Sequence, residues 1–413
     1  MKNKPKILFT TPVLRHPAAG GPYLRIENTI KALSQISELT IYCRTSVTQA
    51  EITYYQQFCQ NFYCAPSTKR INCKLNQLKK IITFFAEKLN LKIFFRQDDD
   101  YRDLLHLADA LHPDIIWLGY GNISYPLLEY IKHHSEYKVV CDTDSVWSRF
   151  VLRGLPFAQH ETDKKKIEME GNEKEEEERR GTQMADVTTA VSEIDAEYYH
   201  KLAKTPEQIH LFSNVIDLKD YIDIPRRPAN FKKPCIYLAG SFGPKSPMDE
   251  AARWVIEKVL PLIKKEIPDI HFYIVGSNSD KTLKDIYDPS ITITGILPSV
   301  LPYLCHADVA IVPIKFESGT RFKILEAGAC NIPVVSTTLG AEGIPVTPKT
   351  NILIADDPEN FAHEIIRLIS DPGYSKIMAT NLHILIKEKY DINVLCAEGT
   401  KIIEYLMNDI SSD

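Results

Sequence analysis

Residues 318–328 read SGTRFKILEAG, and PVVS follows at residues 333–336, which predicts a small-residue loop, a helix and then a short buried strand. Backbone N–H groups at such a loop-to-helix junction are unpaired and carry positive partial charge, so they suit a phosphate. Arg321 and Lys323 add two cations beside the junction. Glu326 follows Gly319 by about two helical turns, roughly 10 Å along the axis. A diphosphate at the helix start would leave its ribose near that carboxylate, so the segment predicts a nucleotide-sugar site.

The alternative for this segment is an ordinary helix N-terminus with a solvated, charged first turn. The rest of the chain helps to decide between the two interpretations. The 413 residues are too many for one ordinary core, so we expect two or three domains.

Composition excludes several function classes. The formal net charge of −5 provides no global basic field for nucleic acid. We find no apolar leader and no run long enough to span a bilayer. The nine cysteines are scattered without a C-x-x-C pair, which favours reduced thiols and a cytoplasmic location. No zinc-ligand spacing occurs, so we predict no metal and no cofactor.

The N-terminal half alternates apolar strands with amphipathic helices, which is typical of a parallel sheet covered on both faces. A loop over residues 17–22 precedes a predicted helix from Tyr23 to Gln35. The predicted strands are residues 6–10, 39–43, 114–118, 137–141, 186–191 and 209–212. The charge run from Glu161 to Arg180 predicts a long, solvated helix, which Gly171 weakens without forbidding.

A second alternation begins after a stretch rich in proline and charge. Its predicted strands are residues 235–240, 271–276, 291–295 and 309–313, with a helix from Met248 to Glu266 and a helical tail from Asp357 onward. We therefore expect an N-terminal domain over residues 1–213, a linker over 214–234 and a C-terminal domain over 235–385. Residues 386–413 are expected to form a helix that packs back toward the N-terminal domain. Two doubly wound Rossmann-like α/β domains would then face a shared cleft.

Six pieces of the C-terminal half, in order, resemble the retaining glycosyltransferases of family four, the group 1 type. They are residues 238–242, 246–254, 272–276, 293–295, 302–304 together with 307–310, and the GTRFKILEAGA block with IPVVST. The resemblance covers residues 235–375 well, and the N-terminal half only in outline. It implies the GT-B fold and sugar transfer from a nucleotide-diphosphate donor, UDP- or GDP-linked. It also implies a glycan or lipid-linked acceptor in surface polysaccharide or glycolipid synthesis.

The resemblance also implies roles for individual residues. Glu326 would hold the ribose, and Arg321 and Lys323 would neutralise the diphosphate. The other implied donor contacts are the backbone of Ser318, Gly319 and Thr320, the base-side residues Gly295 and Leu297, the close-approach glycines Gly20, Gly21 and Gly240, and Lys245 as a phosphate ligand. Ser318 stands where many family members carry a second glutamate.

The acceptor side departs from the family pattern. Where many members carry a histidine, the loop after the strand at residues 137–141 offers Asp142 and Asp144. Either carboxylate would orient the acceptor or act as a base in an inverting route. The alternative is that one of them caps a helix at residues 146–151. Asp142-Thr143-Asp144 is also formally a metal-binding D-x-D motif, although a scheme based on Arg321 and Lys323 requires no metal.

Three other function classes compete with a glycosyltransferase. A dinucleotide oxidoreductase lacks its G-x-G-x-x-G fingerprint here. A non-catalytic GT-B-like binding protein, or a nucleotide-sugar epimerase or phosphorylase, remains an alternative.

Residues 69–96 carry eight Lys and Arg against one Glu, interleaved with phenylalanines and isoleucines. This stretch predicts peripheral contact with the inner face of a membrane, and packing into the N-terminal core is its alternative.

Overall fold

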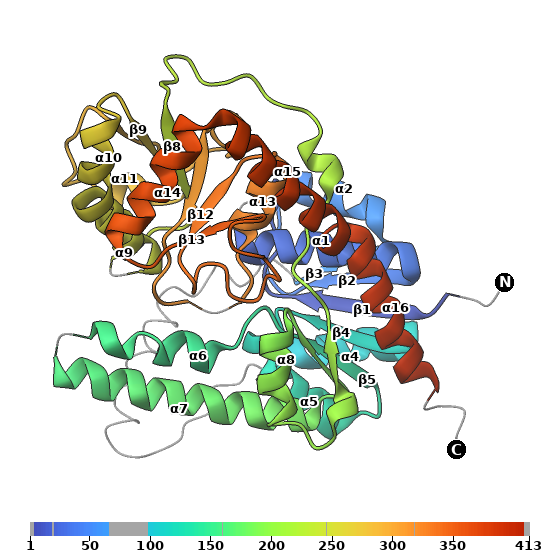
Figure 1. Cartoon of the computed structure of the whole chain (residues 1–413). Coiled ribbons are helices and arrows are strands. Elements are labelled where there is room, and N and C mark those ends of the chain that lie inside the picture. Colours follow the sequence, from blue (N-terminus) through green and yellow to red (C-terminus); the bar gives the residue numbers. More distant parts are fainter. Residues whose placement is uncertain are drawn as a thin grey trace.

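The computed structural model describes residues 4–18, 20–65, 98–158, 160–244, 246–317 and 319–408. It contains two parallel sheets, each flanked by helices (Figure 1). This arrangement confirms the predicted pair of doubly wound α/β domains. The basic and aromatic stretch at residues 69–96 lies outside the described residues.

The N-terminal sheet has the strand order β3-β2-β1-β4-β5-β6-β7, with every pairing parallel. The strands are β1 (Lys6–Thr11), β2 (Glu38–Cys43), β3 (Asn61–Cys64), β4 (Ile115–Gly119), β5 (Lys138–Asp142), β6 (Val187–Ala190) and β7 (Ile209–Leu211). The strand order reverses direction at β1 and β4, which is where such sheets open a crevice for ligands.

The C-terminal sheet repeats this plan in the order β10-β9-β8-β11-β12-β13, again all parallel. Its strands are β8 (Cys235–Ala239), β9 (His271–Val275), β10 (Ile291–Ile293), β11 (Val309–Val312), β12 (Val334–Ser336) and β13 (Leu353–Ile354). The sequence did not predict the edge strands β3 and β13. β3 is mostly exposed and β13 has two residues, so neither shows a buried apolar run.

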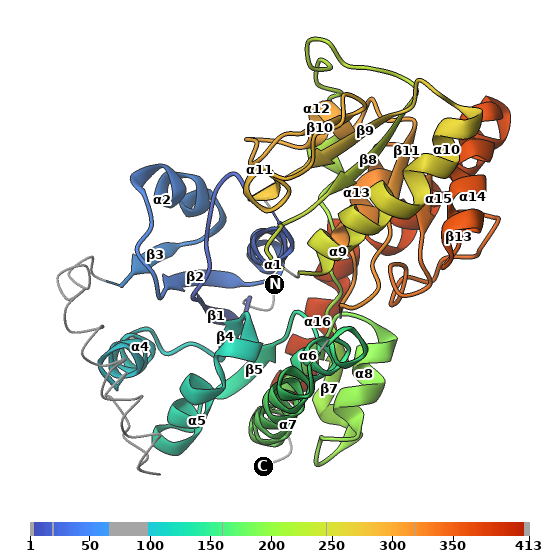
Figure 2. The ribbon, with the colours of Figure 1, turned by 90° about the vertical axis from the view of Figure 1, so that its left-hand side faces the viewer.

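Helices cover both faces of each sheet (Figures 1 and 2). In the first half they are α1 (Gly21–Ile36), α2 (Gln49–Tyr55), α4 (Asp98–Leu111), α5 (Tyr125–His134), α6 (Trp147–Leu152), α7 (Glu161–Met184) and α8 (Glu193–His200). In the second half they are α9 (Pro247–Trp254), α10 (Leu260–Glu266), α11 (Ser279–Thr282), α12 (Leu301–Leu304), α13 (Phe322–Ala329), α14 (Pro358–Ser370), α15 (Pro372–Lys389) and α16 (Ile392–Asn408). A π-helical turn, Val255–Val259, joins α9 to α10, so the helix predicted from Met248 to Glu266 is interrupted by a widened turn.

Helix α16 packs on α1 and contributes to the core of the N-terminal half. Ile392, Leu395 and Ile402 belong to the same buried cluster as Phe9 and Ile30. Gly399 allows the close approach, because a Cβ built there would lie 2.8 Å from Ile36 Cδ1. In Figure 1 this last helix crosses from the C-terminal half and runs along the N-terminal one.

The charge run forms helix α7, as predicted, but one of its glutamates is buried. Glu178 is 1% exposed, and its Oε1 accepts hydrogen bonds from the backbone N–H of Trp147 at 2.7 Å and of Ser148 at 3.2 Å. It therefore caps the N-terminus of α6. Gly171 lets the two helices touch, because a Cβ there would lie 2.4 Å from Leu152 Cδ2.

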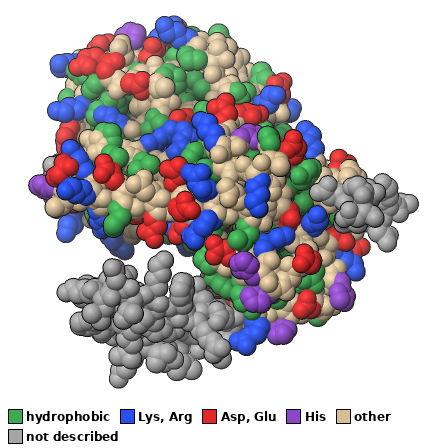
Figure 3. All heavy atoms as spheres, turned by 90° about the horizontal axis from the view of Figure 1, so that it is seen from below, with side chains coloured by type: hydrophobic (Ala, Val, Ile, Leu, Met, Phe, Trp, Pro, Cys, Tyr) green, Lys and Arg blue, Asp and Glu red, His purple; other side chains and the backbone are tan. Residues whose placement is uncertain are grey.

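Charges of both signs are interspersed over the face seen from below (Figure 3). This distribution fits the small net charge and gives that face no basic stripe for nucleic acid among the residues described. Within the described ranges, no helix combines the length and apolar character needed to cross a bilayer.

Candidate functional site

The carboxyl ends of the two sheets meet at the loop before α13. Gly319 has φ +81°, and a Cβ built on it would lie 3.0 Å from Ser145 Cβ and 3.1 Å from the carbonyl oxygen of Asp144. The loop that follows β11 in one half thus rests on the loop that follows β5 in the other. Only glycine suits both this backbone conformation and this close approach. Thr320 adds a hydrogen bond from its Oγ1 to the Val191 carbonyl at 3.4 Å.

Other glycines named by the resemblance lie along the same junction. A Cβ at Gly20 would be 3.9 Å from Ser241 Oγ, and one at Gly21 would be 3.4 Å from Phe322 Cδ2. The loop after β1 therefore faces the loop after β8 and the first residue of α13. Gly240 follows β8 directly. Its carbonyl oxygen lies so close to Gly276 that a Cβ on residue 276 would be only 2.0 Å from it, so that position also needs glycine.

Gly295 and Leu297 follow β10 at the same end of the C-terminal sheet. Gly295 has φ +67°, and its N–H donates to Ser279 Oγ at 3.0 Å. Leu297 is half-buried against the core. Lys245 and Ser318, both predicted phosphate-side residues, lie outside the described residues.

The two cations at the start of α13 have different surroundings. Arg321 is 3% exposed, with its Nε 3.1 Å from Glu317 Oε2 and its Nη2 donating to the Leu339 carbonyl at 3.5 Å. Burial lowers its pKa from the ordinary value. Its Nη1 has no hydrogen-bond partner among the residues described. Lys323 is half-buried and forms no hydrogen bond or ion pair with any described residue, so it is the freer of the two charges.

Glu326 lies one turn further along α13 and has one neutral partner. The hydroxyl of Tyr221, from the segment that links the two halves, donates to its Oε1 at 3.3 Å. Burial raises the pKa of Glu326 to about 7, and the Tyr221 hydrogen bond and the Lys323 charge only partly oppose it. A carboxylate with spare acceptor capacity in such a place suits the hydroxyls of a polar ligand. Sequence reasoning missed Tyr221, because 105 residues separate the partners.

Asp142 lies inside the N-terminal domain, not in the cleft. It has no exposed surface, and Arg25 and Thr189 donate to its Oδ1 while Trp117 Nε1 donates to its Oδ2. Arg25 is 2% exposed and also bonds Asn214 Oδ1 at 2.8 Å and the Phe212 carbonyl at 3.1 Å. With both oxygens occupied, the carboxylate is an internal ion-pair partner and is not positioned to serve an acceptor.

Asp144 remains as the carboxylate at the junction. It is half-buried, and its Oδ1 accepts from Trp147 Nε1 at 3.2 Å. Burial raises its pKa to about 6, against the opposing effect of Arg25. Neither aspartate caps α6, because Glu178 from α7 does so. Around both aspartates, no group of three His, Cys, Asp or Glu side chains has a metal-binding arrangement within the described ranges.

Helix α6 also connects the two halves across this junction. Arg153 forms a bidentate ion pair with Glu342, in which each of its two Nη atoms lies 2.8 Å from a carboxylate oxygen. Its Nη1 also donates a hydrogen bond to the Glu317 carbonyl at 2.6 Å. Nearby, the rings of Phe157 and Phe316 are 4.8 Å apart. These contacts hold the loop before α13 against the N-terminal half.

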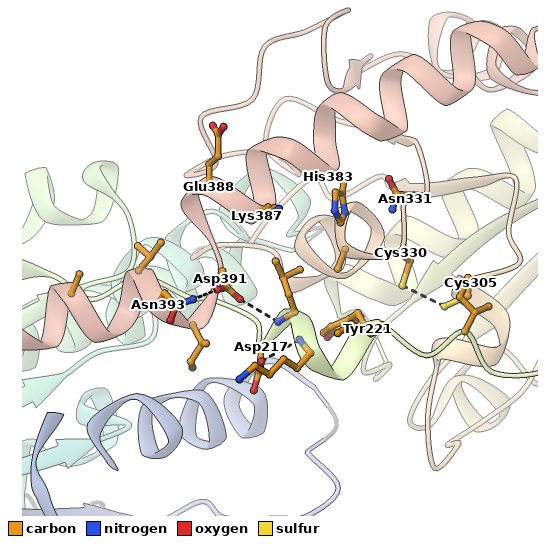
Figure 4. A pocket seen from close by; sticks show the side chains of 18 of the residues that line it. Asp217, Tyr221, Cys305, Cys330, Asn331, His383, Lys387, Glu388, Asp391 and Asn393 are labelled. Atoms are coloured by element: carbon orange, nitrogen blue, oxygen red, sulfur yellow. Dashed lines mark hydrogen bonds between the residues drawn. The ribbon is translucent and has the colours of Figure 1, made fainter. Parts of the chain in front are cut away.

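A separate pocket of about 930 Å³ lies at the other end of α13 (Figure 4). The linker segment, the ends of α12 and α13, and the α15–α16 corner line it. Tyr221 lies in its wall and touches Glu326, so the pocket adjoins α13 at the end away from Gly319.

Comparisons with known proteins now bear on this geometry. Residues 233–371 match the family model described as glycosyl transferases group 1. Sucrose-phosphate synthase from Thermosynechococcus elongatus superposes with a TM-score of 0.66 at 16% identity, over 98% of this chain and 100% of the other. Anabaena HepE, solved in complex with UDP, gives 0.63 at 14% identity, over 97% and 99%. The chain has the GT-B fold.

Two curated relatives match over shorter stretches. An uncharacterised 44.6 kDa protein in the cps region of Klebsiella pneumoniae is 31% identical over 147 residues, 33% of this chain. A GDP-mannose-dependent phosphatidylinositol monomannoside mannosyltransferase of Corynebacterium glutamicum is 27% identical over 128 residues, 28% of this chain. The chain spans only 38% and 34% of the length of these relatives. Together with the GT-B fold, the family match supports a glycosyltransferase.

Proposed function

We propose that this GT-B chain transfers a sugar from a UDP- or GDP-linked donor to a glycan or lipid-linked acceptor, with retention at the anomeric carbon. The proposal rests on the arrangement of charged side chains at the start of α13. There, Lys323, which has no partner among the described residues, and Glu326, whose carboxylate accepts one hydrogen bond from them, lie one turn apart, beside the loop on which the two sheets meet. A diphosphate beside the cation would leave a ribose beside the carboxylate.

The proposed chemistry is electrostatic. The bond between C1 of the sugar and the phosphate oxygen breaks, and negative charge develops on the diphosphate while the sugar becomes oxocarbenium-like. Lys323, Arg321 and the backbone N–H groups at the start of α13 would stabilise that charge. In a front-face route the departing phosphate oxygen takes the acceptor proton. Retention is supported by the enclosure of Asp142, which removes one candidate base from the cleft.

The decisive experiment is incubation with UDP- and GDP-sugars, one at a time, with measurement of nucleotide release in the presence of candidate glycan and lipid acceptors. Release above the rate without protein supports the proposal, and the anomeric configuration of the product, read by NMR, tests retention. Tight nucleotide binding without turnover would instead identify a binding protein. Activity is expected to persist in EDTA, and strict metal dependence would contradict a scheme in which Arg321 and Lys323 alone neutralise the diphosphate.

The name of the Corynebacterium relative supports GDP-mannose and a membrane lipid as one donor and acceptor pair to test. The basic stretch at residues 69–96 would then hold the protein at the inner face of the membrane, where surface polysaccharide and glycolipid precursors lie. Flotation with liposomes tests this part: binding should need anionic lipid and weaken with salt. Equal recovery with neutral lipid would contradict it.

A further inference from the structure

Two cysteines that are 25 residues apart in the chain come together in the pocket lined by the linker segment and the α15–α16 corner, which we call the hinge pocket. Cys305 directly follows α12, and Cys330 directly follows α13. Their Sγ atoms are 3.4 Å apart, in a hydrogen-bonding arrangement. A disulfide bond is about 2.05 Å long, so the two sulfurs need to approach by roughly 1.4 Å. Both are free thiols in this structure.

Small molecules have access to both sulfurs. Cys305 and Cys330 are half-buried and lie in the wall of the pocket of about 930 Å³, together with His383 and Lys387 (Figure 4). By contrast, Cys141 and Cys235 are fully buried in strands. Access and a neighbouring thiol are the two conditions that separate redox-active cysteines from inert ones.

The two cysteines differ in their pKa values, as an attacking thiol and a resolving thiol should. The pKa of the Cys305 thiol is lowered, because the Cys330 thiol can hydrogen-bond to its thiolate. The pKa of Cys330 is raised by the same contact and by burial. Cys305 is therefore suited to attack an oxidant first, with Cys330 in place to resolve the product.

We propose that Cys305 and Cys330 form a peroxide-responsive dithiol that closes to a disulfide in the wall of the hinge pocket. The Cys305 thiolate attacks the peroxide O–O bond and becomes a sulfenic acid, while the other oxygen leaves as water after taking a proton. The Cys330 sulfur then attacks the Cys305 sulfur, the S–S bond forms, and the second oxygen leaves as water. The two thiols supply the two electrons that reduce one hydrogen peroxide to two waters.

The bond would join the ends of two segments at the donor side. Cys330 N–H donates to the Glu326 carbonyl at 3.0 Å, so the cysteine is attached to the last turn of α13. Cys305 follows the segment that contains Gly295 and Leu297. An effect on the donor site rests on the proposed function, whereas formation of the bond does not.

The test uses the full chain, reduced, freed of reductant and treated with a small excess of hydrogen peroxide. The intact mass should fall by two hydrogens, and peptide mapping should place the link between Cys305 and Cys330. In Cys330→Ser the link should be lost, and dimedone should trap Cys305 as its sulfenic acid. Cys396→Ser, which removes another half-buried thiol, should leave the link unchanged.

Three results would overturn the proposal: a parent protein in which both thiols remain open to N-ethylmaleimide after peroxide, a link that maps to another pair, or dimedone labelling of Cys330→Ser elsewhere than at Cys305. Cys305→Ser provides a second variant should Cys330→Ser fold poorly, and it should show neither the link nor fast labelling of Cys330. All of these readouts are independent of glycosyltransferase activity.

Discussion

The carboxyl end of β5 and the start of α13 each hold a carboxylate with a cation nearby, yet they differ in how completely those charges are paired. Asp142 has three donors and no exposed surface, and its partner Arg25 has three acceptors. At α13, Glu326 has one neutral donor and Lys323 has no partner among the described residues. The carboxyl end of β5 and the start of α13 lie on either side of the same junction between the two halves.

The difference separates charges that are paired within the protein from charges that remain available to a ligand. Both oxygens of Asp142 are occupied, so this carboxylate has little left to offer a ligand, although Arg25 Nε has no partner among the described residues. Removing one member of a buried ion pair leaves the other uncompensated. A cation without a partner beside a carboxylate with a raised pKa indicates a candidate ligand site. The first region should therefore respond to mutation through stability, and the second through binding and turnover.

The largest effect is expected for Asp142→Asn. The amide keeps the shape but leaves the Arg25 charge buried without a counter-charge, so the free energy of unfolding should fall by about 3–5 kcal/mol. Urea unfolding followed by circular dichroism measures it. Glu177→Gln, in the partly exposed pair with Lys174, is the matched control and should change stability by less than about 1 kcal/mol. Equal, small losses in both would show that the buried Arg25 charge does not depend on Asp142 for stability.

Glu326→Ala should act on turnover and not on folding. Loss of the acceptor for the ribose hydroxyls should remove about 2–4 kcal/mol of transition-state binding, so nucleotide release should slow at least tenfold. Glu388→Ala, on the exposed side of α15, is the control and should keep the parent rate. A folded Glu326→Ala protein with the parent rate would remove this carboxylate from the donor site.

The two cations should differ from each other. Lys323→Ala should weaken UDP or GDP binding about 10- to 100-fold, because it deletes a charge-assisted contact to the diphosphate, and should leave the melting temperature unchanged. Arg321→Ala should weaken nucleotide binding too, but should also lower the melting temperature, because Arg321 packs against Glu317 and Leu339 at the junction. Calorimetry and thermal scanning distinguish the pair. Unaltered nucleotide affinity in Lys323→Ala would show that Lys323 does not contact the diphosphate.

The smallest effect is the pH dependence of nucleotide binding. Burial raises the pKa of Glu326 to about 7, so the free protein holds this carboxyl largely protonated at pH 6 and ionised at pH 8. In the proposed site the ionised form would accept two ribose hydroxyls, so nucleotide affinity should increase severalfold as pH rises through about 7. Glu326→Gln should retain only the titration of the nucleotide phosphates. Parallel profiles for the two proteins would show that Glu326 does not titrate in the site.

Sequence patterns predicted the two sheets and helix α13 because their signals are local: apolar runs of strand length, and a small-residue loop that leads into a helix. They did not predict which charges pair. Arg25 lies 117 residues from Asp142, and Tyr221 lies 105 residues from Glu326. The cap that Glu178 provides for α6 could not be predicted for a similar reason. A glutamate within a run of charged residues is expected to be solvated unless the helix that packs against it is known. Separation along the chain likewise concealed Cys305 and Cys330.

The packing of α16 on α1 has a consequence for the order in which the chain folds during synthesis. The N-terminal core includes Leu395, Ile402 and Leu406, which leave the ribosome only after residues 235–385 have been made. The usual N-to-C order of domain completion is therefore reversed. The second half has all its strands available first, while the first half waits with part of its apolar surface exposed. A chain truncated after Asp391 and released from the ribosome should have a protease-resistant C-terminal half joined to a protease-sensitive N-terminal one.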